Sequence, residues 1–197
     1  MHRYGDTLDE TERIIQQCEL LHYGIGVNYF DSNEEPPTTF YMHNVMIPSI
    51  WCNIQKIRED AVLPSAATPF SAGFDLHACL PENSVTIQPG ETYLVPLGFR
   101  TSFSNGYAGL IYARSGLATK KGLAPANCVG VIDSDYRGEW MVPLHNSSKE
   151  PQTIMNGERV AQCVFSLAPF TYFNEVDEID TTDSERGEGG FGSTGSK

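Results

Sequence analysis

Basic residues are scarce in this chain. Its 197 residues include 13 Lys and Arg against 25 Asp and Glu, which gives a formal net charge of -12 at pH 7. A surface of this sign does not neutralise a nucleic-acid backbone, so no nucleic-acid partner is expected. A bound anion would have to be met by a few placed arginines, backbone N–H groups and a cation.

The chain also lacks long apolar runs and closely spaced cysteines. No run approaches the roughly 18 apolar residues of a membrane-spanning helix, so no membrane partner is expected. The first residues are too polar for a secretory signal, which favours a cytoplasmic or nuclear protein. The five cysteines are widely spaced and form no CxxC pair, a pattern typical of free thiols in a reducing compartment.

Charge and local pattern divide the chain into three parts. Residues 1–50 are acidic and contain an amphipathic pattern over residues 7–22, where Thr7 and Glu10 have the spacing of a capping box. We therefore expect an N-terminal extension with one short helix and a linker, which is a candidate contact for a protein partner. Residues 175–197 are acidic and then glycine-rich, as is typical of a mobile C-terminal arm.

The middle of the chain, residues 51–174, is nearly neutral and has the pattern of a β protein. Apolar residues alternate along residues 93–99 and again along 140–144, and turn residues keep such segments short. The 18 glycines and 12 prolines also interrupt helices. The sequence therefore predicts an all-β core with a jelly-roll-like β-sandwich or barrel.

Five polar segments interrupt this pattern and are candidates for chemistry: residues 71–78 (SAGFDLHA), 113–122 (ARSGLATKKG), 127–140 (NCVGVIDSDYRGEW), 156–165 (NGERVAQCVF) and 186–195 (RGEGGFGSTG). In the first, Asp75 lies between apolar neighbours, so a strand would direct its carboxylate to the opposite face. In the third, Asp133 and Asp135 project from one face of an extended chain. Such carboxylates can act as a general base, hold a cation through water, or form a surface charge network.

The residues around these groups leave alternatives open. Val129, Val131 and Ile132 are apolar, which predicts that the strand carrying Asp133 is anchored in a core. The basic residues and hydroxyl of segment 113–122 suit a phosphate cradle as well as an ordinary turn. Polar side chains in the fourth segment would face either backbone groups or a ligand. The last segment suits a flexible tail, although a linker seldom needs an aromatic ring that can stack on a base.

Together, the order and spacing of the five segments resemble the trimeric dUTP diphosphatase (dUTPase) family over roughly residues 51–197. The resemblance implies a jelly-roll-like subunit and a homotrimer with three active sites at subunit interfaces. It also implies Mg²⁺-dependent hydrolysis of dUTP to dUMP and pyrophosphate. This reaction keeps uracil out of DNA and supplies dUMP for dTMP synthesis.

The same resemblance implies a role for individual residues. Asp133 is expected to deprotonate the attacking water, and Asp75 to hold a water of the magnesium shell. The Tyr136 ring is expected to pack under the deoxyribose and leave no room for a 2′-hydroxyl. The expected contacts to uracil are Asn127 and the backbone from Cys128 to Gly130, and the expected contacts to phosphate are Arg114, Ser115, Gly116 and Gln162.

The arm is usually supplied by a different subunit in this family. Phe191 matches the residue that stacks on uracil, and the residues that match those closing over the triphosphate are Arg186, Gly192, Ser193 and Thr194. Ala113 departs from the family, which usually has proline there, and residues 1–50 have no counterpart in the family core. A loosened backbone ahead of Ser115 would lower affinity without abolishing activity.

Two other functions remain as alternatives. A dCTP deaminase shares the fold, but its branch has a different motif in place of the one that contains Asp133 and Tyr136. A regulatory protein could instead bind dUTP as a signal and contact a partner through residues 1–50. Deletion of that extension, with turnover and partner binding both measured, separates regulation from catalysis.

Overall fold

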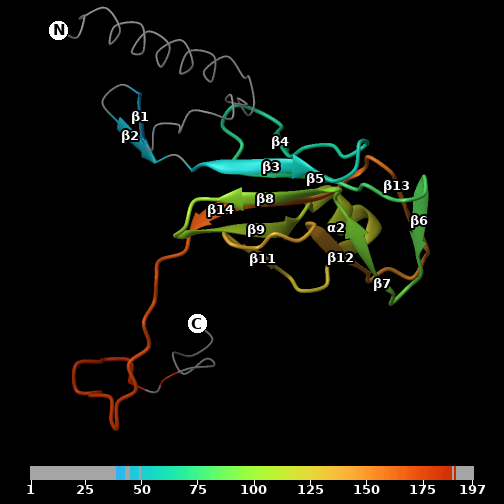
Figure 1. The fold of residues 1–197 in the computed structure, drawn as a ribbon. Helices are drawn as coiled ribbons and strands as arrows, with labels where there is room; N and C mark the ends of the chain where they lie inside the picture. The colour runs from blue at the N-terminus through green and yellow to red at the C-terminus, as the bar shows by residue number, and fades with distance from the viewer. Residues whose placement is uncertain (1–38, 43–44, 49, 188, 190–197) are drawn as a thin grey trace, which may run out of the picture.

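The computed structural model describes residues 39–42, 45–48, 50–187 and 189 (Figure 1). The helix expected at residues 7–22 lies outside this part of the chain, as do the arm residues Phe191, Gly192, Ser193 and Thr194. Within the described residues strands dominate, and the single helix there is short. The predicted all-β fold class is therefore confirmed.

The elements follow one another with short connections. The first strands are β1 (Thr39–Met42), β2 (Val45–Pro48), β3 (Cys52–Lys56), β4 (Ser65–Ala66), β5 (Phe74–His77), β6 (Ser84–Ile87), β7 (Thr92–Pro96), β8 (Phe99–Phe103) and β9 (Tyr107–Ala113). They are followed by α2 (Ser115–Lys121), β10 (Leu123–Pro125), β11 (Gly130–Asp133), β12 (Met141–Asn146), β13 (Gln152–Met155) and β14 (Arg159–Leu167).

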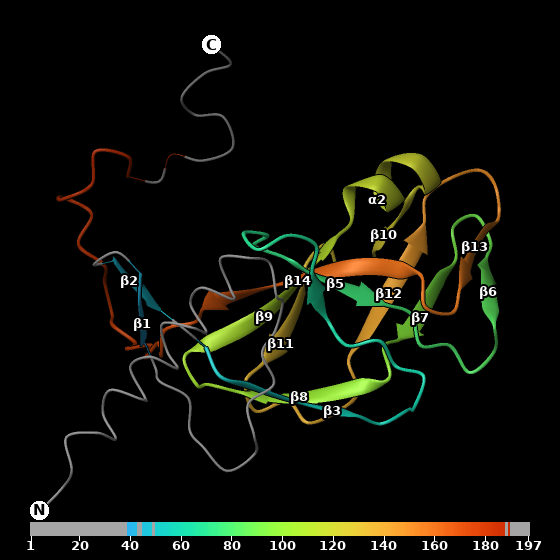
Figure 2. The same cartoon turned by 90° about the horizontal axis from the view of Figure 1, so that it is seen from above.

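The largest sheet has the strand order β11-β9-β14-β5-β4, and each neighbouring pair in it is antiparallel. Its long central strand β14 pairs with β9 on one side and β5 on the other. A second sheet, β10-β12-β7, and the ribbons β13-β6 and β3-β8 complete the core. Figures 1 and 2 show the β13-β6 ribbon at one end of the molecule and the β1-β2 ribbon toward the other.

The alternating segments of the sequence supply the core, as predicted. Val95, Leu97 and Phe99 are fully buried, while Leu94, directly before Val95, is exposed. The buried Trp140 ring lies 5.4 Å from the Phe99 ring, between centroids, and its indole N–H donates to Thr101 Oγ1 at 3.0 Å. Because this N–H has a partner, the largest side chain of the core is buried without an unpaired donor.

The strand that carries Asp133 differs from its prediction in one respect. Of the three apolar residues before the aspartate, Ile132 packs against the core, but Val131 is 61% exposed and Val129 is exposed as well. The expectation that all three anchor the strand was wrong, because β11 is the edge strand of its sheet and one of its faces has no layer over it. An apolar surface therefore lies beside Asp133.

The chain leaves its own core after β14. Ala168 N–H still donates to Gly106 O, whereas residues 169–187 form their hydrogen bonds within that segment and to Gly189. Tyr172 and Phe173 are more than 90% exposed. Figure 1 shows this segment extending away from the sheets in orange and red. In the described part of the chain, no helix has the length and apolarity needed to cross a membrane.

Candidate active site

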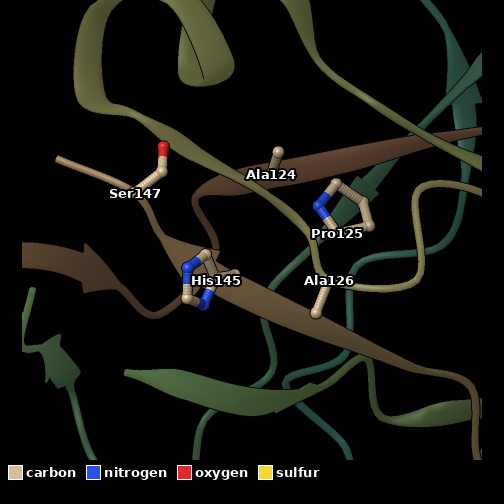
Figure 3. A pocket seen from close by; sticks show the side chains of 5 residues that line it. All are labelled: Ala124, Pro125, Ala126, His145 and Ser147. Carbon is tan, nitrogen blue, oxygen red and sulfur yellow. The ribbon is translucent and has the colours of Figure 1, made fainter. Parts of the chain in front are cut away.

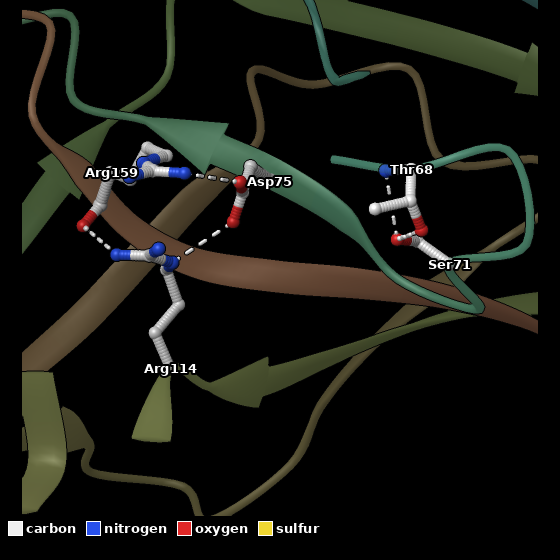
Figure 4. A network of polar contacts seen from close by, with 5 residues as sticks. All are labelled: Thr68, Ser71, Asp75, Arg114 and Arg159. Atoms are coloured by element: carbon white, nitrogen blue, oxygen red, sulfur yellow. Dashed lines mark hydrogen bonds and ion pairs between the residues drawn. The ribbon is translucent and has the colours of Figure 1, made fainter. Parts of the chain in front are cut away.

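An ion-pair cluster joins the first, second and fourth polar segments. The Asp75 carboxylate, on β5, accepts two hydrogen bonds (Figure 4). Arg114 Nε donates to its Oδ1 at 2.9 Å, and Arg159 Nη1 donates to its Oδ2 at 3.0 Å. The Asp75 side chain is 15% exposed, so this carboxylate is largely removed from water. Arg114 Nη1 also donates to Arg159 O at 3.4 Å. The carboxylate thus fixes the orientation of both guanidinium groups.

The register of the sheet explains why these residues meet. Asp75 stands opposite Gln162 across the β5–β14 pair, and β14 also pairs with β9, which ends one residue before Arg114. Two guanidinium groups share one carboxylate, which leaves one positive charge in excess. Such a cluster suits an anionic ligand, because a planar guanidinium recognises phosphate through paired N–H groups.

Gln162 lies beside this cluster with its amide oriented by the backbone. Its Nε2 donates to Ala113 O at 3.0 Å. A Cβ added at Gly73 would lie 2.8 Å from Gln162 Oε1, so the glycine leaves the space that this amide occupies. The polar side chains of segment 156–165 were expected to face backbone groups or a ligand, and Arg159 in that segment pairs instead with Asp75. Gly73, in segment 71–78, is the member of this group that the sequence analysis did not single out.

His77 adds no positive charge to the cluster at neutral pH. Burial lowers the pKa of His77 below its usual range, although the nearby Asp75 carboxylate opposes this effect. Among the described residues, its Nδ1 is the one buried side-chain nitrogen or oxygen that has no hydrogen-bond partner. The excess charge of the cluster therefore comes from Arg114 and Arg159.

Ser115 and Gly116 open the short helix α2 directly after Arg114. The Arg114 carbonyl accepts the N–H groups of Leu117 and Ala118, so the first two helical N–H groups are left for other acceptors. Ser115 and Gly116 are both exposed. The predicted phosphate contacts Arg114, Ser115, Gly116 and Gln162 therefore come together, with Asp75 in their midst.

The third polar segment begins in a tight turn between β10 and β11, which belong to different sheets. Cys128 has a φ of 60°, which is unusual for a residue with a side chain, and Val129 N–H donates to Asn127 O at 2.6 Å. At Gly130 an added Cβ would lie 3.1 Å from Ile111 Cβ and 3.5 Å from Asn127 Nδ2. The missing side chain thus lets the Asn127 amide lie over β11.

Asp133 and Tyr136 lie at the other end of β11, in one turn. Tyr136 N–H donates to Asp133 O at 3.1 Å, and both side chains are exposed. They line an open pocket of about 320 Å³ together with Leu94, Val131, Ile132, Glu139 and Met141. The pocket offers one carboxylate, one aromatic ring and apolar walls, which suits a general base beside a nucleoside.

These two groups of predicted residues are separated within one subunit. Asp133 pairs with Ala108 near the start of β9, whereas Arg114 follows the last residue of that strand. Six residues of extended chain span roughly 20 Å. The structure therefore brings the phosphate contacts together and brings Asp133 to Tyr136, but it does not bring Asp133 to Arg114.

The remaining features are set apart from both groups. Arg186 is exposed in the arm, and its Nε donates to Gly189 O at 2.8 Å. A second hollow of about 300 Å³ contains none of the predicted site residues and is lined by Ala124, Pro125, Ala126, His145 and Ser147 (Figure 3). Within the described ranges, no three His, Cys, Asp or Glu residues cluster as metal ligands would.

Comparisons with known proteins agree on one family. The sequence model of the dUTPase family matches residues 59–195. A deoxyuridine 5′-triphosphate nucleotidohydrolase of Desulfitobacterium hafniense is 47% identical over 120 residues, which are 59% of this chain and 79% of that protein. One of Neisseria meningitidis serogroup B is 52% identical over 104 residues, which are 52% of this chain and 69% of that protein.

Solved structures give the same result. A mutant dUTPase of Staphylococcus bacteriophage 80alpha, solved with dUpNHpp, matches with a TM-score of 0.65 and 26% identity, over 74% of this chain and 98% of that one. The dUTPase of Streptococcus mutans matches with a TM-score of 0.54 and 31% identity, over 62% of this chain and 98% of that one. The family model covers well over half of the sequence, and this chain belongs to the dUTPase family.

Proposed function

We propose that this chain hydrolyses dUTP to dUMP and pyrophosphate, at a site shared between the subunits of a homotrimer. The observation that carries the proposal is the pocket at the end of β11, where the Asp133 carboxylate and the Tyr136 ring share one turn. The named relatives are deoxyuridine 5′-triphosphate nucleotidohydrolases, and a neighbour of known structure holds dUpNHpp.

Asp133 acts as the general base in this reaction. Its carboxylate takes a proton from a water molecule, whose oxygen bonds to the α-phosphorus. At the same time, the bond breaks between the α-phosphorus and the oxygen that bridges to the β-phosphate. Pyrophosphate then leaves with the electron pair of that bond. Asp133 ends a hydrogen-bonded strand, which supports this role because a base fixed by its backbone holds the water in line.

The phosphate chain binds to the cluster around Asp75. The guanidinium of Arg114 and the N–H groups of Ser115 and Gly116 offer donors to its oxygens, and Gln162 adds an amide. The excess positive charge of the cluster supports this assignment, because a triphosphate would be repelled by the net charge of the whole chain.

Magnesium fits this cluster through water rather than by direct ligation. Each Asp75 oxygen accepts one guanidinium N–H and retains capacity for a further hydrogen bond, while two cationic groups stand where a bare metal ion would approach. We therefore assign Asp75 to a water of the magnesium shell. When bound, the ion supplies charge neutralisation on the triphosphate. A structural Mg(II) ion is named for the dUTPase of phage phi11 of S. aureus.

The homotrimer accounts for the separation of the two groups of residues. One subunit does not bring Asp133 and Arg114 together, because they lie at opposite ends of β9. A site that contains both residues must therefore take them from different subunits. The exposed apolar side chains of Leu94, Val131 and Met141 beside Asp133 support a neighbour at this place, since such a patch is typical of an interface. The arm, which leaves its own core, carries Arg186, Phe191, Gly192, Ser193 and Thr194 to a neighbouring site.

Selection of the nucleotide is assigned to β11 and its flanking turns. Asn127 and the backbone from Cys128 to Gly130 read the pairing edge of uracil, and the tight turn leaves no room for a 5-methyl group. The Tyr136 ring packs under the sugar. The crowding at Gly130 supports a closely packed turn, because even one carbon atom added there would press on Ile111.

Regulation is the second candidate function. Phage dUTPases, among them the 80alpha enzyme, control transfer of virulence genes, and this chain matches the 80alpha enzyme with 26% identity. A chain of this family with an added segment, residues 1–50, is therefore a candidate for partner binding. Removal of that segment with retained turnover and loss of a co-purifying protein would support it. The matching relatives are dUTPases, which argues against the dCTP deaminase alternative.

Product analysis tests the proposed reaction. We expect ³¹P NMR to detect pyrophosphate from dUTP far sooner than from dTTP, UTP or dCTP, and chelation of magnesium to slow its release. Asp133→Asn should lower kcat by roughly 10²- to 10⁴-fold, with the trimer retained. Asp135→Asn, two residues further on, is the matched control and should remain active. Equal turnover of all four nucleotides, or a fully active Asp133→Asn, would refute the proposal.

A further inference from the structure

The Tyr136 ring is tied to the turn that carries it. Its hydroxyl donates to Glu139 O at 3.1 Å, and its N–H donates to Asp133 O at 3.1 Å. The residue is nevertheless 44% exposed, so packing alone does not fix the ring. One hydrogen bond holds the tip of the side chain, and the other holds the backbone that carries it, in the turn that also contains Asp133.

Gly138 provides the space in which the ring lies. A Cβ added at Gly138 would overlap the Tyr136 ring, with Oη and Cζ as its closest neighbours and Cε2 at 3.0 Å. Gly138 is not among the glycines with positive φ, so its backbone conformation does not require glycine. What requires it is the ring, which rests directly against the Gly138 backbone.

Glu139 connects this arrangement to the core. Its Oε1 accepts the N–H of Gly98 at 2.9 Å, in the turn between β7 and β8. The next residue, Trp140, donates its N–H to Phe99 O and accepts the N–H of Leu97, both at 3.0 Å. The carbonyl that receives the Tyr136 hydroxyl is thus held by three hydrogen bonds to a buried turn.

We infer that Gly138 and Glu139 are positioning residues that set the discrimination between deoxyribose and ribose. The inference rests on the proposed function, in which the Tyr136 ring packs under the sugar. A ring excludes one additional hydroxyl only if it cannot move by about the width of that group. Gly138 sets how closely the Tyr136 ring can approach the backbone. Glu139 fixes the position of the carbonyl that accepts the Tyr136 hydroxyl.

Gly138→Ala displaces the ring and tests the inference most directly. We expect the ratio of kcat/KM for dUTP to kcat/KM for UTP to fall about tenfold or more, because the ring leaves the position complementary to the deoxyribose. The ratio of kcat/KM for dUTP to kcat/KM for dTTP should stay unchanged, since the base is read by the turn that contains Asn127 and Gly130. The melting temperature should change little, because an exposed ring can move aside.

Glu139 offers a graded version of the same test. Glu139→Ala removes the acceptor for Gly98 N–H and should lower the dUTP to UTP ratio, while Glu139→Gln keeps an acceptor oxygen and should restore it. The matched control is Glu91→Ala, which also removes a carboxylate that accepts a backbone N–H, here from Gln88 at 2.8 Å. That variant should keep both ratios. The Glu139 pair carries the test if Gly138→Ala does not fold.

The outcomes separate this inference from the proposed function. A wild-type protein that treats dUTP and UTP alike would refute both. A wild-type protein that discriminates, with an unchanged dUTP to UTP ratio in Gly138→Ala and Glu139→Ala, would refute the positioning role alone. Equal losses of sugar and base discrimination would also refute it, because they would indicate a general disturbance of the pocket.

Discussion

Asp133 and Arg114 lie at opposite ends of β9, the first paired with its start and the second following its last residue. Strand β9 is held on both sides, by β11 and β14, so the two side chains cannot approach each other by a local movement. A reaction that needs both groups must therefore draw them from different copies of the chain. This separation is the structural basis of the proposed composite site.

The ion-pair cluster predicts the effect of removing one arginine. Arg159→Gln should raise KM for dUTP about tenfold and lower kcat much less, because Asp75 would then neutralise the remaining guanidinium. Steady-state kinetics with dUTP measure both constants. Arg100→Gln is the control, since its guanidinium binds Gln55 on the β3-β8 ribbon. An unchanged KM in Arg159→Gln would contradict a role of the cluster in phosphate binding.

The arm is predicted to matter for turnover and not for stability of the core. Deletion of residues 175–197 should lower kcat/KM for dUTP by about 100-fold, because the arm excludes water and holds the triphosphate. The melting temperature should stay within a few degrees, since the hydrogen bonds of residues 169–187 are made within that segment and to Gly189. Deletion of residues 1–38 is the control, and its kcat/KM and melting temperature are compared with those of the arm deletion. Full activity without the arm would show that it takes no part.

Thiol labelling should separate the cysteines. Burial raises the pKa of Cys79 to about 11 and that of Cys163 to about 12, and the hydrogen bond from Cys79 to Asp60 adds to the first effect. At pH 8 both should resist iodoacetamide in the folded protein, while the exposed Cys128 reacts.

Nucleotides then locate the base site. The experiment uses a Cys18→Ser variant, because Cys18 lies outside the described residues. In this variant dUTP should protect Cys128 from labelling and dCTP should not, which mass spectrometry of the labelled peptides measures. If Cys128 is labelled equally fast with and without dUTP, the result would argue against a uracil site at the turn between β10 and β11.

A buried amide holds the end of β12. Asn146 is fully buried, and its Nδ2 donates to Ile87 O and Glu150 O at 2.9 and 2.8 Å. Asn146→Ala should lower the free energy of unfolding by about 2–4 kcal/mol, because two carbonyls lose their donors and a cavity remains. Urea denaturation at one fixed protein concentration measures this loss. Asn105→Ala, at an exposed site, should cost under about 0.5 kcal/mol, and a similar loss in both variants would contradict the prediction.

Local patterns predicted the strands of the core. Alternation along residues 93–99 placed Val95, Leu97 and Phe99 in the core, because burial on one face of a strand leaves a period of two in the sequence. Segment 113–122 was interpreted as a cradle or a turn, and the structure has the helix α2 there. Its signals were two lysines in the last turn and Gly122, whose φ of 65° ends the helix.

Contacts between distant strands could not be predicted in the same way. Arg159 and Asp75 are 84 residues apart, and their ion pair depends on the register of β14 against β5, with a shift between Arg159 and Ala161. No local pattern encodes that register. The exposure of Val131 also differs from the prediction, because an exposed apolar residue has the same local pattern as a buried one.

Complementation between two inactive variants tests the shared site most directly. Asp133→Asn and Arg114→Ala should each be inactive alone. After unfolding and refolding together in equal amounts, about a quarter of the sites would combine an intact Asp133 with an intact Arg114 from another subunit. We predict that dUTP hydrolysis returns to about that fraction of the wild-type rate in mixed trimers. Mixed trimers that remain inactive would contradict the composite site.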